Sequence, residues 1–122
     1  QNYCKEKKIK VNKITFSRAI TNLIINSYEA FFEKNGRIDL IIKDYKKVIL
    51  IKIEDNGKGM TDEEIEKAFK IGYSTKKSSG VGLNFIKTVM DEHKYELKIL
   101  NKRNGGLGAY IVIKGENIEN EK

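Results

Sequence analysis

The spacing of hydrophobic and polar positions changes twice along the first part of the chain, and each change marks a predicted element. Residues 9–11 alternate apolar side chains with lysine, which predicts a short first strand. From Thr15 to about Asn35 the apolar positions recur at helical spacing, and Asn35-Gly36 is a typical helix end. The predicted apolar face of this helix consists of Phe16, Ile20, Leu23, Ile24, Ser27 and Phe31.

Strand and helix patterns then follow one another to the end of the chain. Asn, Asp and Gly must form the turns between them, because the chain contains no proline. The predicted elements are two strands joined through Asp44-Tyr45 (Arg37–Lys43 and Lys46–Glu54), a short helix capped by Thr61 or Asp62 and ending at Phe69, a helix from about Val81 to His93, and a hairpin of Tyr95–Lys102 and Leu107–Lys114. Residues 115–122 are expected to be a frayed tail.

This order of elements predicts an α/β (α+β) fold. We expect a two-layer sandwich, with about three helices packed on one face of a mixed, mostly antiparallel five-stranded sheet. We expect one domain over residues 1–122, with an ordered core from about residue 9 to residue 114. Because the chain begins at Gln1 and not at methionine, we also expect it to be a segment of a longer protein.

The composition says more about the cellular location of the chain than about its activity. The net charge is +7, from 21 lysines and 3 arginines against 17 acidic residues. Scattered lysines favour a solvated basic surface, although a nucleic-acid-binding module stays open from the charge alone. Cys4 is the one cysteine, which favours a reducing, cytoplasmic location. The apolar run Val48–Ile51 is far shorter than the roughly 20 residues of a membrane-spanning helix.

The first predicted helix carries a polar stripe. Arg18, Asn22, Asn26 and Glu29 share it, roughly opposite the apolar face. Two carboxamides one turn apart can present oxygens to Mg²⁺ or bind phosphate. The alternative is a solvent-exposed polar face, which amphipathic helices ordinarily have.

A second candidate site follows the strand that ends near Glu54. Asp55 stands there, followed by Gly57 and Gly59. A carboxylate beside backbone without side chains can accept a hydrogen bond from an exocyclic amine while a flat ring packs close to it. The alternative is a tight Asp-Asn-Gly turn.

The third candidate is the stretch "GYSTKKSSGVGLNF". Ser74, Thr75 and Lys76 can supply hydroxyl groups and a cation, and Gly80 and Gly82 leave N–H groups uncovered at the start of a helix. Such a segment binds phosphate in some proteins and is only a connector in others.

The order of these three stretches resembles the catalytic and ATP-binding domain of bacterial sensor histidine kinases, in the superfamily of DNA gyrase, Hsp90 and MutL. "NLIINSYEA" is similar to the N box of that family, and "DNGKGM" is similar to its G1 box. "FKIGYSTKKSSGVGLNFIK" resembles the F box running through the ATP lid into the G2 box. "MDEHKYELKILNKRNGGLGAYIVI" is similar to the closing helix and hairpin, so the resemblance covers about residues 9–113.

The resemblance implies ATP and Mg²⁺ as ligands and gives each motif a role. Asn26 would be the Mg²⁺ ligand, and Asn22 a nearby phosphate or metal contact. Asp55 would hold adenine N6, with Gly57 and Gly59 lining the base pocket. The phosphate-side residues would be Ser74, Thr75 and Lys76 in the lid, and Gly80, Val81, Gly82 and Leu83 closing over the triphosphate.

By the same resemblance the chain is a protein-histidine kinase domain and not a hydrolase. Hydrolysing members carry a glutamate where this chain has Asn22, and a carboxamide cannot act as general base toward water. The γ-phosphate would pass to a histidine on a separate dimerisation domain and then to a response regulator. No catalytic residue is expected within the chain, because His93 stands in the family's own helix-end position and the phosphoacceptor would lie outside.

The resemblance also extends to the parent protein, which would be a homodimeric sensor anchored in the inner membrane, without a nucleic-acid partner. Three other functions stay open from the residues. The chain could be a serine kinase of the same fold that regulates a sigma-factor-like partner, a basic nucleic-acid-binding module, or a degenerate domain that holds nucleotide only as a structural element.

Overall fold

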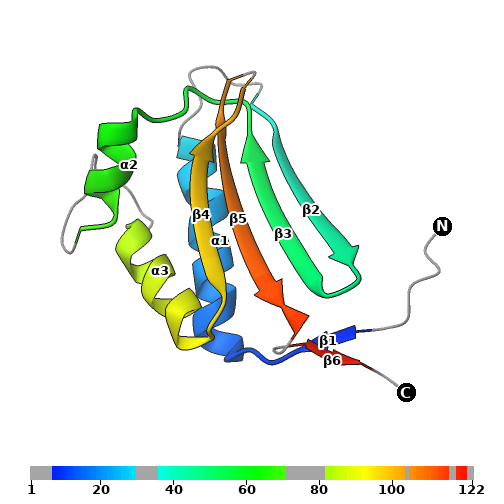
Figure 1. Ribbon diagram of the computed structural model, residues 1–122. Coiled ribbons are helices and arrows are strands. Elements are labelled where there is room, and N and C mark those ends of the chain that lie inside the picture. The colour runs from blue at the N-terminus through cyan, green and yellow to red at the C-terminus, as the bar shows by residue number, and fades with distance from the viewer. Residues whose placement is uncertain (1–6, 30–35, 71–81, 104, 116–117, 121–122) are drawn as a thin grey trace.

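The computed structural model describes residues 7–29, 36–70, 82–103, 105–115 and 118–120 of the chain. Within them, three helices pack on one face of an antiparallel sheet, as Figure 1 shows. The predicted two-layer α+β architecture is therefore confirmed. No helix among the described residues combines the length and the apolar composition needed to cross a membrane.

The main sheet has four strands, and every neighbouring pair is antiparallel. Its spatial order is β2-β3-β5-β4. The strand bounds are Ile38–Tyr45 for β2, Val48–Asp55 for β3, Glu96–Asn101 for β4 and Leu107–Lys114 for β5.

The prediction of a mixed, five-stranded sheet is wrong for the described residues. The first strand, β1 (Lys7–Ile9), pairs instead with β6 (Ile118–Asn120) in a separate two-stranded antiparallel sheet. The tail predicted to be frayed therefore contains a strand. Two three-residue strands at opposite ends of a chain carry too little pattern for their pairing to be read from sequence.

The hairpin of β2 and β3 turns two residues later than predicted. Tyr45 pairs with Val48, which leaves Lys46 and Lys47 as the turn in place of Asp44-Tyr45. The buried positions of β3 fix this register, because Ile49, Ile51 and Ile53 must all face the helices.

The helices are α1 (Lys13–Glu29), α2 (Asp62–Ala68) and α3 (Leu83–Glu92). Thr61 caps α2 as predicted: its side chain accepts the Glu64 N–H, and the Glu64 carboxylate accepts the Thr61 N–H. This backbone hydrogen bond from Thr61 lowers the pKa of Glu64. The cap of α1 was not predicted, and it is Asn12, whose Oδ1 accepts from the N–H groups of Ile14 and Thr15.

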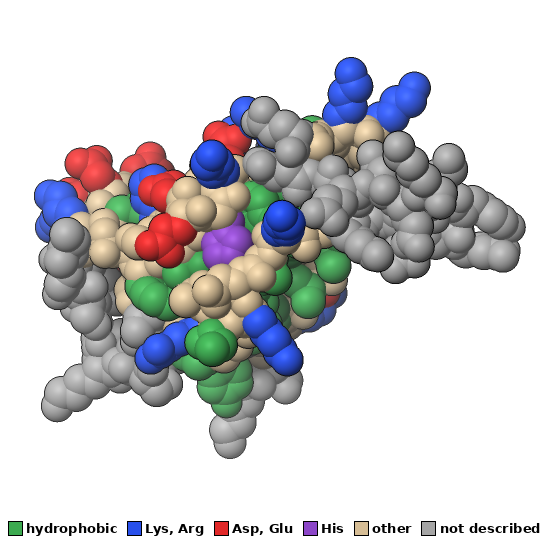
Figure 2. Space-filling model, turned by 90° about the horizontal axis from the view of Figure 1, so that it is seen from below, with side chains coloured by type: hydrophobic (Ala, Val, Ile, Leu, Met, Phe, Trp, Pro, Cys, Tyr) green, Lys and Arg blue, Asp and Glu red, His purple; other side chains and the backbone are tan. Residues whose placement is uncertain are grey.

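The start of α1 is tied to the end of α3. The Asn12 N–H donates to His93 Nε2 at 2.8 Å, and His93 Nδ1 donates to the Val89 carbonyl oxygen at 2.7 Å, which requires a neutral imidazole. Figure 2 views this end of the molecule from below, with the histidine in purple at the surface. The Tyr95 hydroxyl donates to the carbonyl oxygen of Lys10, so two side chains hold the segment that leads into α1.

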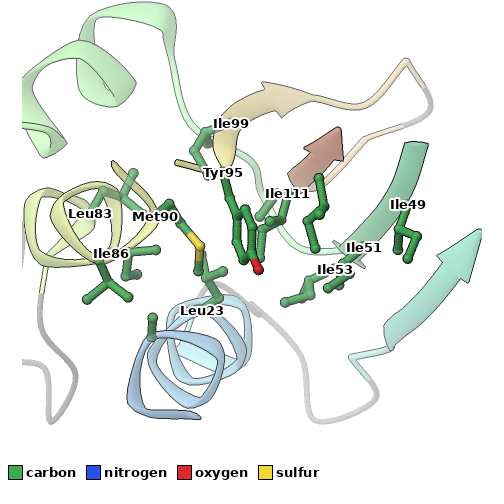
Figure 3. Packing of buried hydrophobic residues seen from close by; sticks show 14 of the residues in the cluster. Leu23, Ile49, Ile51, Ile53, Leu83, Ile86, Met90, Tyr95, Ile99 and Ile111 are labelled. Carbon is green, nitrogen blue, oxygen red and sulfur yellow. The ribbon is translucent and has the colours of Figure 1, made fainter. Parts of the chain in front are cut away.

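The core lies between α1, α3 and the inner face of the sheet, as Figure 3 shows. Its fully buried large apolar side chains are Ile53, Ile86, Met90, Ile111 and Ile113. Leu23 of α1 and Leu83 of α3 point into the same cluster. These contacts place the C-terminal half of α1 behind the end of the sheet at which β3 finishes (Figure 1).

The buried face of α1 differs from the predicted face. Ala19 and Leu23 are buried, whereas Ile20 and Ile24 are only half-buried. Asn22 and Ser27 are buried too, at 6% and 7% exposure. The polar stripe of α1 is therefore not a solvent-exposed face at Asn22.

Candidate functional site

Asp55 is a buried carboxylate at the end of β3. It continues the alternation of Ile49, Ile51 and Ile53, and it is 1% exposed. Its Oδ1 accepts two backbone hydrogen bonds, from the N–H of Gly57 at 2.9 Å and from the N–H of Leu107 at 3.1 Å. Its Oδ2 is also buried and has no hydrogen-bond partner among the described residues.

The second oxygen of Asp55 is the observation that points most directly to a ligand. A buried acceptor left without a donor costs about 1–3 kcal/mol, and more when the group is charged. Native proteins keep few such groups, and those they keep commonly serve a site. A ligand N–H group at this position would satisfy Oδ2, which matches the amine donor predicted from the sequence.

The loop after Asp55 packs directly on the turn between β4 and β5. Gly106 has φ +89°, and a Cβ at this position would overlap the Asp55 carbonyl oxygen. Gly59 has φ +71°, and a Cβ there would lie 2.6 Å from Asn101 Oδ1. Both positions therefore favour glycine, and at Gly59 the predicted glycine leaves room for the Asn101 side chain.

Polar side chains fix this loop from both sides. Asn101 accepts the Met60 N–H at 2.9 Å through Oδ1 and donates to the Met60 carbonyl oxygen through Nδ2. Lys102 Nζ donates to the Asp55 carbonyl oxygen at 3.1 Å. On the other side, Asn56 Oδ1 accepts the Arg37 N–H at 2.7 Å. The sequence contained no signal for these long-range contacts beyond the Gly-rich turn itself.

A cavity of about 520 Å³ opens beside this junction. It is lined by Lys58, Gly59, Met60, Thr61, Glu64, Asn101, Lys102, Arg103, Gly105 and Gly106. Among the predicted site residues that the structure describes, only Gly59 lines this cavity. It therefore lies next to the Asp55 loop without including the carboxylate.

On α1, the two predicted asparagines lie one turn apart. Asn22 is buried, and its Nδ2 donates to the Arg18 carbonyl oxygen at 2.9 Å. Asn26 is half-buried. Asn26 can offer a carboxamide oxygen of the kind that Mg²⁺ accepts. Among the residues that the structure describes, no three His, Cys, Asp or Glu side chains are grouped as metal ligands.

At the start of α3, Gly82 is the N-cap residue and makes no side-chain capping bond. Leu83 is 5% exposed and belongs to the core, so its side chain anchors the helix. Asn84 Nδ2 donates to the Phe69 carbonyl oxygen at 3.0 Å, which joins the start of α3 to the end of α2. The predicted phosphate-side residues Ser74, Thr75, Lys76, Gly80 and Val81 lie outside the described residues.

Residues 11–116 match the family described as histidine kinase-, DNA gyrase B-, and HSP90-like ATPase. The chain is 32% identical over 92 residues to the probable C4-dicarboxylate sensor kinase of Halalkalibacterium halodurans, covering 71% of this chain and 17% of that protein. It is 35% identical over 99 residues to the sensor protein CitS of Bacillus subtilis, covering 80% and 18%. The chain thus spans less than a fifth of the length of these two relatives.

Solved structures share the fold. The catalytic domain of histidine kinase ThkA, in a nucleotide-free form, superposes with a TM-score of 0.74 at 23% identity, covering 88% of this chain and 69% of that one. The mycobacterial sensor histidine kinase MprB superposes with a TM-score of 0.77 at 20% identity, covering 90% and 76%. At these identities the likeness establishes the architecture.

Proposed function

Because this chain belongs to the family of histidine kinase-, DNA gyrase B- and HSP90-like ATPases, we propose that it is the ATP-binding catalytic domain of a sensor histidine kinase. In this function it binds Mg-ATP and positions the γ-phosphate for a histidine on a separate dimerisation domain. The observation that carries the proposal is the buried Asp55, with one oxygen held by two backbone N–H groups and the other without a described partner.

Asp55 selects the base through its Oδ2. An ionised carboxylate only accepts hydrogen bonds, so it favours a purine with an amino group at position 6. Adenine has that group, whereas guanine presents a carbonyl oxygen there. The two N–H groups on Oδ1 keep the carboxylate from rotating, which supports a fixed recognition geometry. Gly57 and Gly59 follow in the loop that would pass beside the base.

The phosphate end is proposed to involve α1 and the segment before α3. Asn26 would hold Mg²⁺ through its carboxamide oxygen, and Asn22 would lie one turn nearer the helix start. Bound Mg²⁺ would bridge phosphate oxygens and neutralise charge that develops during transfer. The remaining phosphate contacts are proposed from the family resemblance alone, and they are Ser74, Thr75, Lys76, Gly80, Val81, Gly82 and Leu83.

Transfer, and not hydrolysis, follows from the chemistry of Asn22. A carboxamide has no basic oxygen that could remove a proton from water, so the chain lacks a general base at this position. The phosphoacceptor histidine would belong to the dimerisation domain and the next acceptor to a response regulator. The parent would be a homodimeric, membrane-anchored sensor with this domain on the cytoplasmic side.

The alternative is a serine kinase of the same fold. The two relatives described above carry sensor names, which favours histidine as the acceptor. The test incubates the proposed parent protein, which would include the dimerisation domain, with γ-labelled ATP and Mg²⁺. Histidine transfer gives a label that is lost in acid and stable in alkali, whereas a label that survives acid and is lost in alkali would support the serine alternative.

Nucleotide binding is tested on the chain itself. Calorimetry with Mg²⁺ and a non-hydrolysable ATP analogue should give saturable binding, and a GTP analogue should bind much more weakly. Absence of binding to the ATP analogue, or equal binding of both analogues, would overturn the proposed site.

A further inference from the structure

Arg18 belongs to the polar stripe on α1, and the proposed function gives it no role. Its guanidinium lies over the ring of Phe85, 5.8 Å from the ring centroid, so it spans from α1 to the first turn of α3. Arg18 is exposed, and it forms no ion pair with a described residue. A cation is therefore held in place between two helices without a described carboxylate to neutralise it.

The position of Arg18 along α1 matches one end of an extended ligand. The C-terminal half of α1 lies behind the end of the sheet at which β3 finishes with Asp55 (Figure 1). Asn26, Asn22 and Arg18 follow one another by single turns away from that end, over about 12 Å at 1.5 Å per residue. Arg18 therefore lies farthest from the carboxylate that would hold the base.

The contact with Phe85 suits Arg18 to phosphate. A cation–π contact with the ring does not consume the N–H donors of the guanidinium, which stay available to a ligand. Those donors match pairs of phosphate oxygens. Phe85 also comes three residues after Gly82, the cap residue of α3, so the cation contacts the same helix start that carries Gly82 and Leu83, two of the proposed phosphate-side residues.

We propose that Arg18 is a phosphate-positioning residue that binds the terminal phosphate of the nucleotide, with Phe85 holding its guanidinium in the required orientation. The inference rests on the proposed function, because it needs a triphosphate in the site of Asp55 and Asn26. It adds a residue that recognises the group to be transferred. Discrimination between ATP and ADP would then depend on α1 itself.

The test compares a triphosphate with a diphosphate. Calorimetry is run on the chain with Mg²⁺, using a non-hydrolysable ATP analogue and ADP. Arg18→Gln should weaken binding of the ATP analogue about 10-fold, as expected for one lost charge-assisted hydrogen bond, and change ADP binding less than about twofold. Arg18→Lys keeps the positive charge but lacks the planar guanidinium. The logarithm of its affinity ratio between the ATP analogue and ADP should lie about halfway between the values of the unmodified chain and of Arg18→Gln.

Two further variants separate positioning from general charge effects. Lys13→Gln removes one positive charge from the same helix and should leave the ratio of the two affinities unchanged. Phe85→Leu removes the ring and keeps Arg18, and it should reduce the preference for the triphosphate by about threefold. Thermal unfolding of each variant by circular dichroism checks that the fold is intact, and Arg18→Lys carries the test if Arg18→Gln does not fold.

The possible outcomes distinguish the two proposals. If the unmodified chain binds neither nucleotide, the proposed function and this inference both fall. If it binds the ATP analogue and Arg18→Gln weakens both nucleotides equally, or neither, the inference is overturned and the proposed function stands. A loss confined to the triphosphate supports the role of Arg18.

Discussion

Replacing Asp55 by asparagine changes one group at the centre of the proposed base site. The side chain keeps its shape, and Oδ1 faces the N–H groups of Gly57 and Leu107. An asparagine must therefore place its oxygen there, and its NH₂ group takes the position of Oδ2. Asp55→Asn thus converts a buried acceptor that has no described partner into a donor, while the contacts that hold the loop persist.

The expected size of the effect follows from that single hydrogen bond. A hydrogen bond to a charged group contributes about 1.5–3 kcal/mol, and about 1.4 kcal/mol corresponds to a tenfold change in affinity. Asp55→Asn should therefore weaken an ATP analogue about 10- to 150-fold. The free energy of unfolding should change little or increase, because the variant removes a buried charge.

An inosine analogue makes the assay specific for this atom, because inosine carries a carbonyl oxygen where adenine has its amino group. By calorimetry the unmodified chain should prefer the adenine analogue strongly, and Asp55→Asn should reduce or reverse that preference. Asp91→Asn, at the exposed end of α3, serves as the control for loss of one negative charge. The reasoning is refuted if Asp55→Asn binds the adenine analogue as well as the unmodified chain does, or leaves the preference between the bases unchanged.

Two other predictions concern stability. Gly106→Ala should lower the free energy of unfolding by about 3 kcal/mol or more, because φ is +89° and the new Cβ would overlap the backbone of Asp55. Gly105→Ala should lower it by only about 1 kcal/mol for its positive φ, because the new Cβ meets no atom within 4 Å. Equal losses of the two variants in urea denaturation would contradict this packing. Burial and the hydrogen bond to Glu54 raise the pKa of Tyr110 from 10.0 to about 12. The folded state thus holds this proton more tightly, so the stability it contributes is complete below pH 10 and is lost as pH rises toward 12. In denaturation measured across this pH range, Tyr110→Phe should therefore lose less unfolding free energy than the unmodified chain. A difference in unfolding free energy between the two proteins that does not change with pH would refute the assignment.

Much of the fold could be predicted because each element carries its own local signal. The strand predicted to end at Glu54, the Thr61 cap and the helix predicted from about Val81 to His93 each have a local signal, and the structure contains all three elements. The resemblance to the histidine kinase domain is confirmed by the family match and by the relatives. Ordered motifs specify a family more firmly than any one of them specifies a site.

Two of the errors, the pairing of β1 and the exposure of Asn22, concern contacts between distant segments. Such contacts produce little signal in the local sequence. β1 pairs with β6 more than 100 residues later, which no pattern in either three-residue strand indicates. Asn22 was predicted to lie opposite the apolar face, yet it is buried, as are Ala19 and Leu23 of the same helix. Periodicity reports the polarity of a helix face, and tertiary packing then decides which part of that face is covered.

The hydrogen bond of Asn22 indicates which steps of phosphoryl transfer the proposed site could support. Its Nδ2 donates to the Arg18 carbonyl oxygen one turn earlier on α1, and the side chain is buried, so the amide is held in one orientation. A carboxamide so held can orient a neighbouring group, but it cannot accept a proton at neutral pH. An attacking hydroxyl or imidazole must then bring its own base, which the proposed function assigns to the partner domain. Hydrolysis by the chain alone should accordingly be slow even when nucleotide is tightly bound, because the proposed site would bind and position the nucleotide without activating the nucleophile.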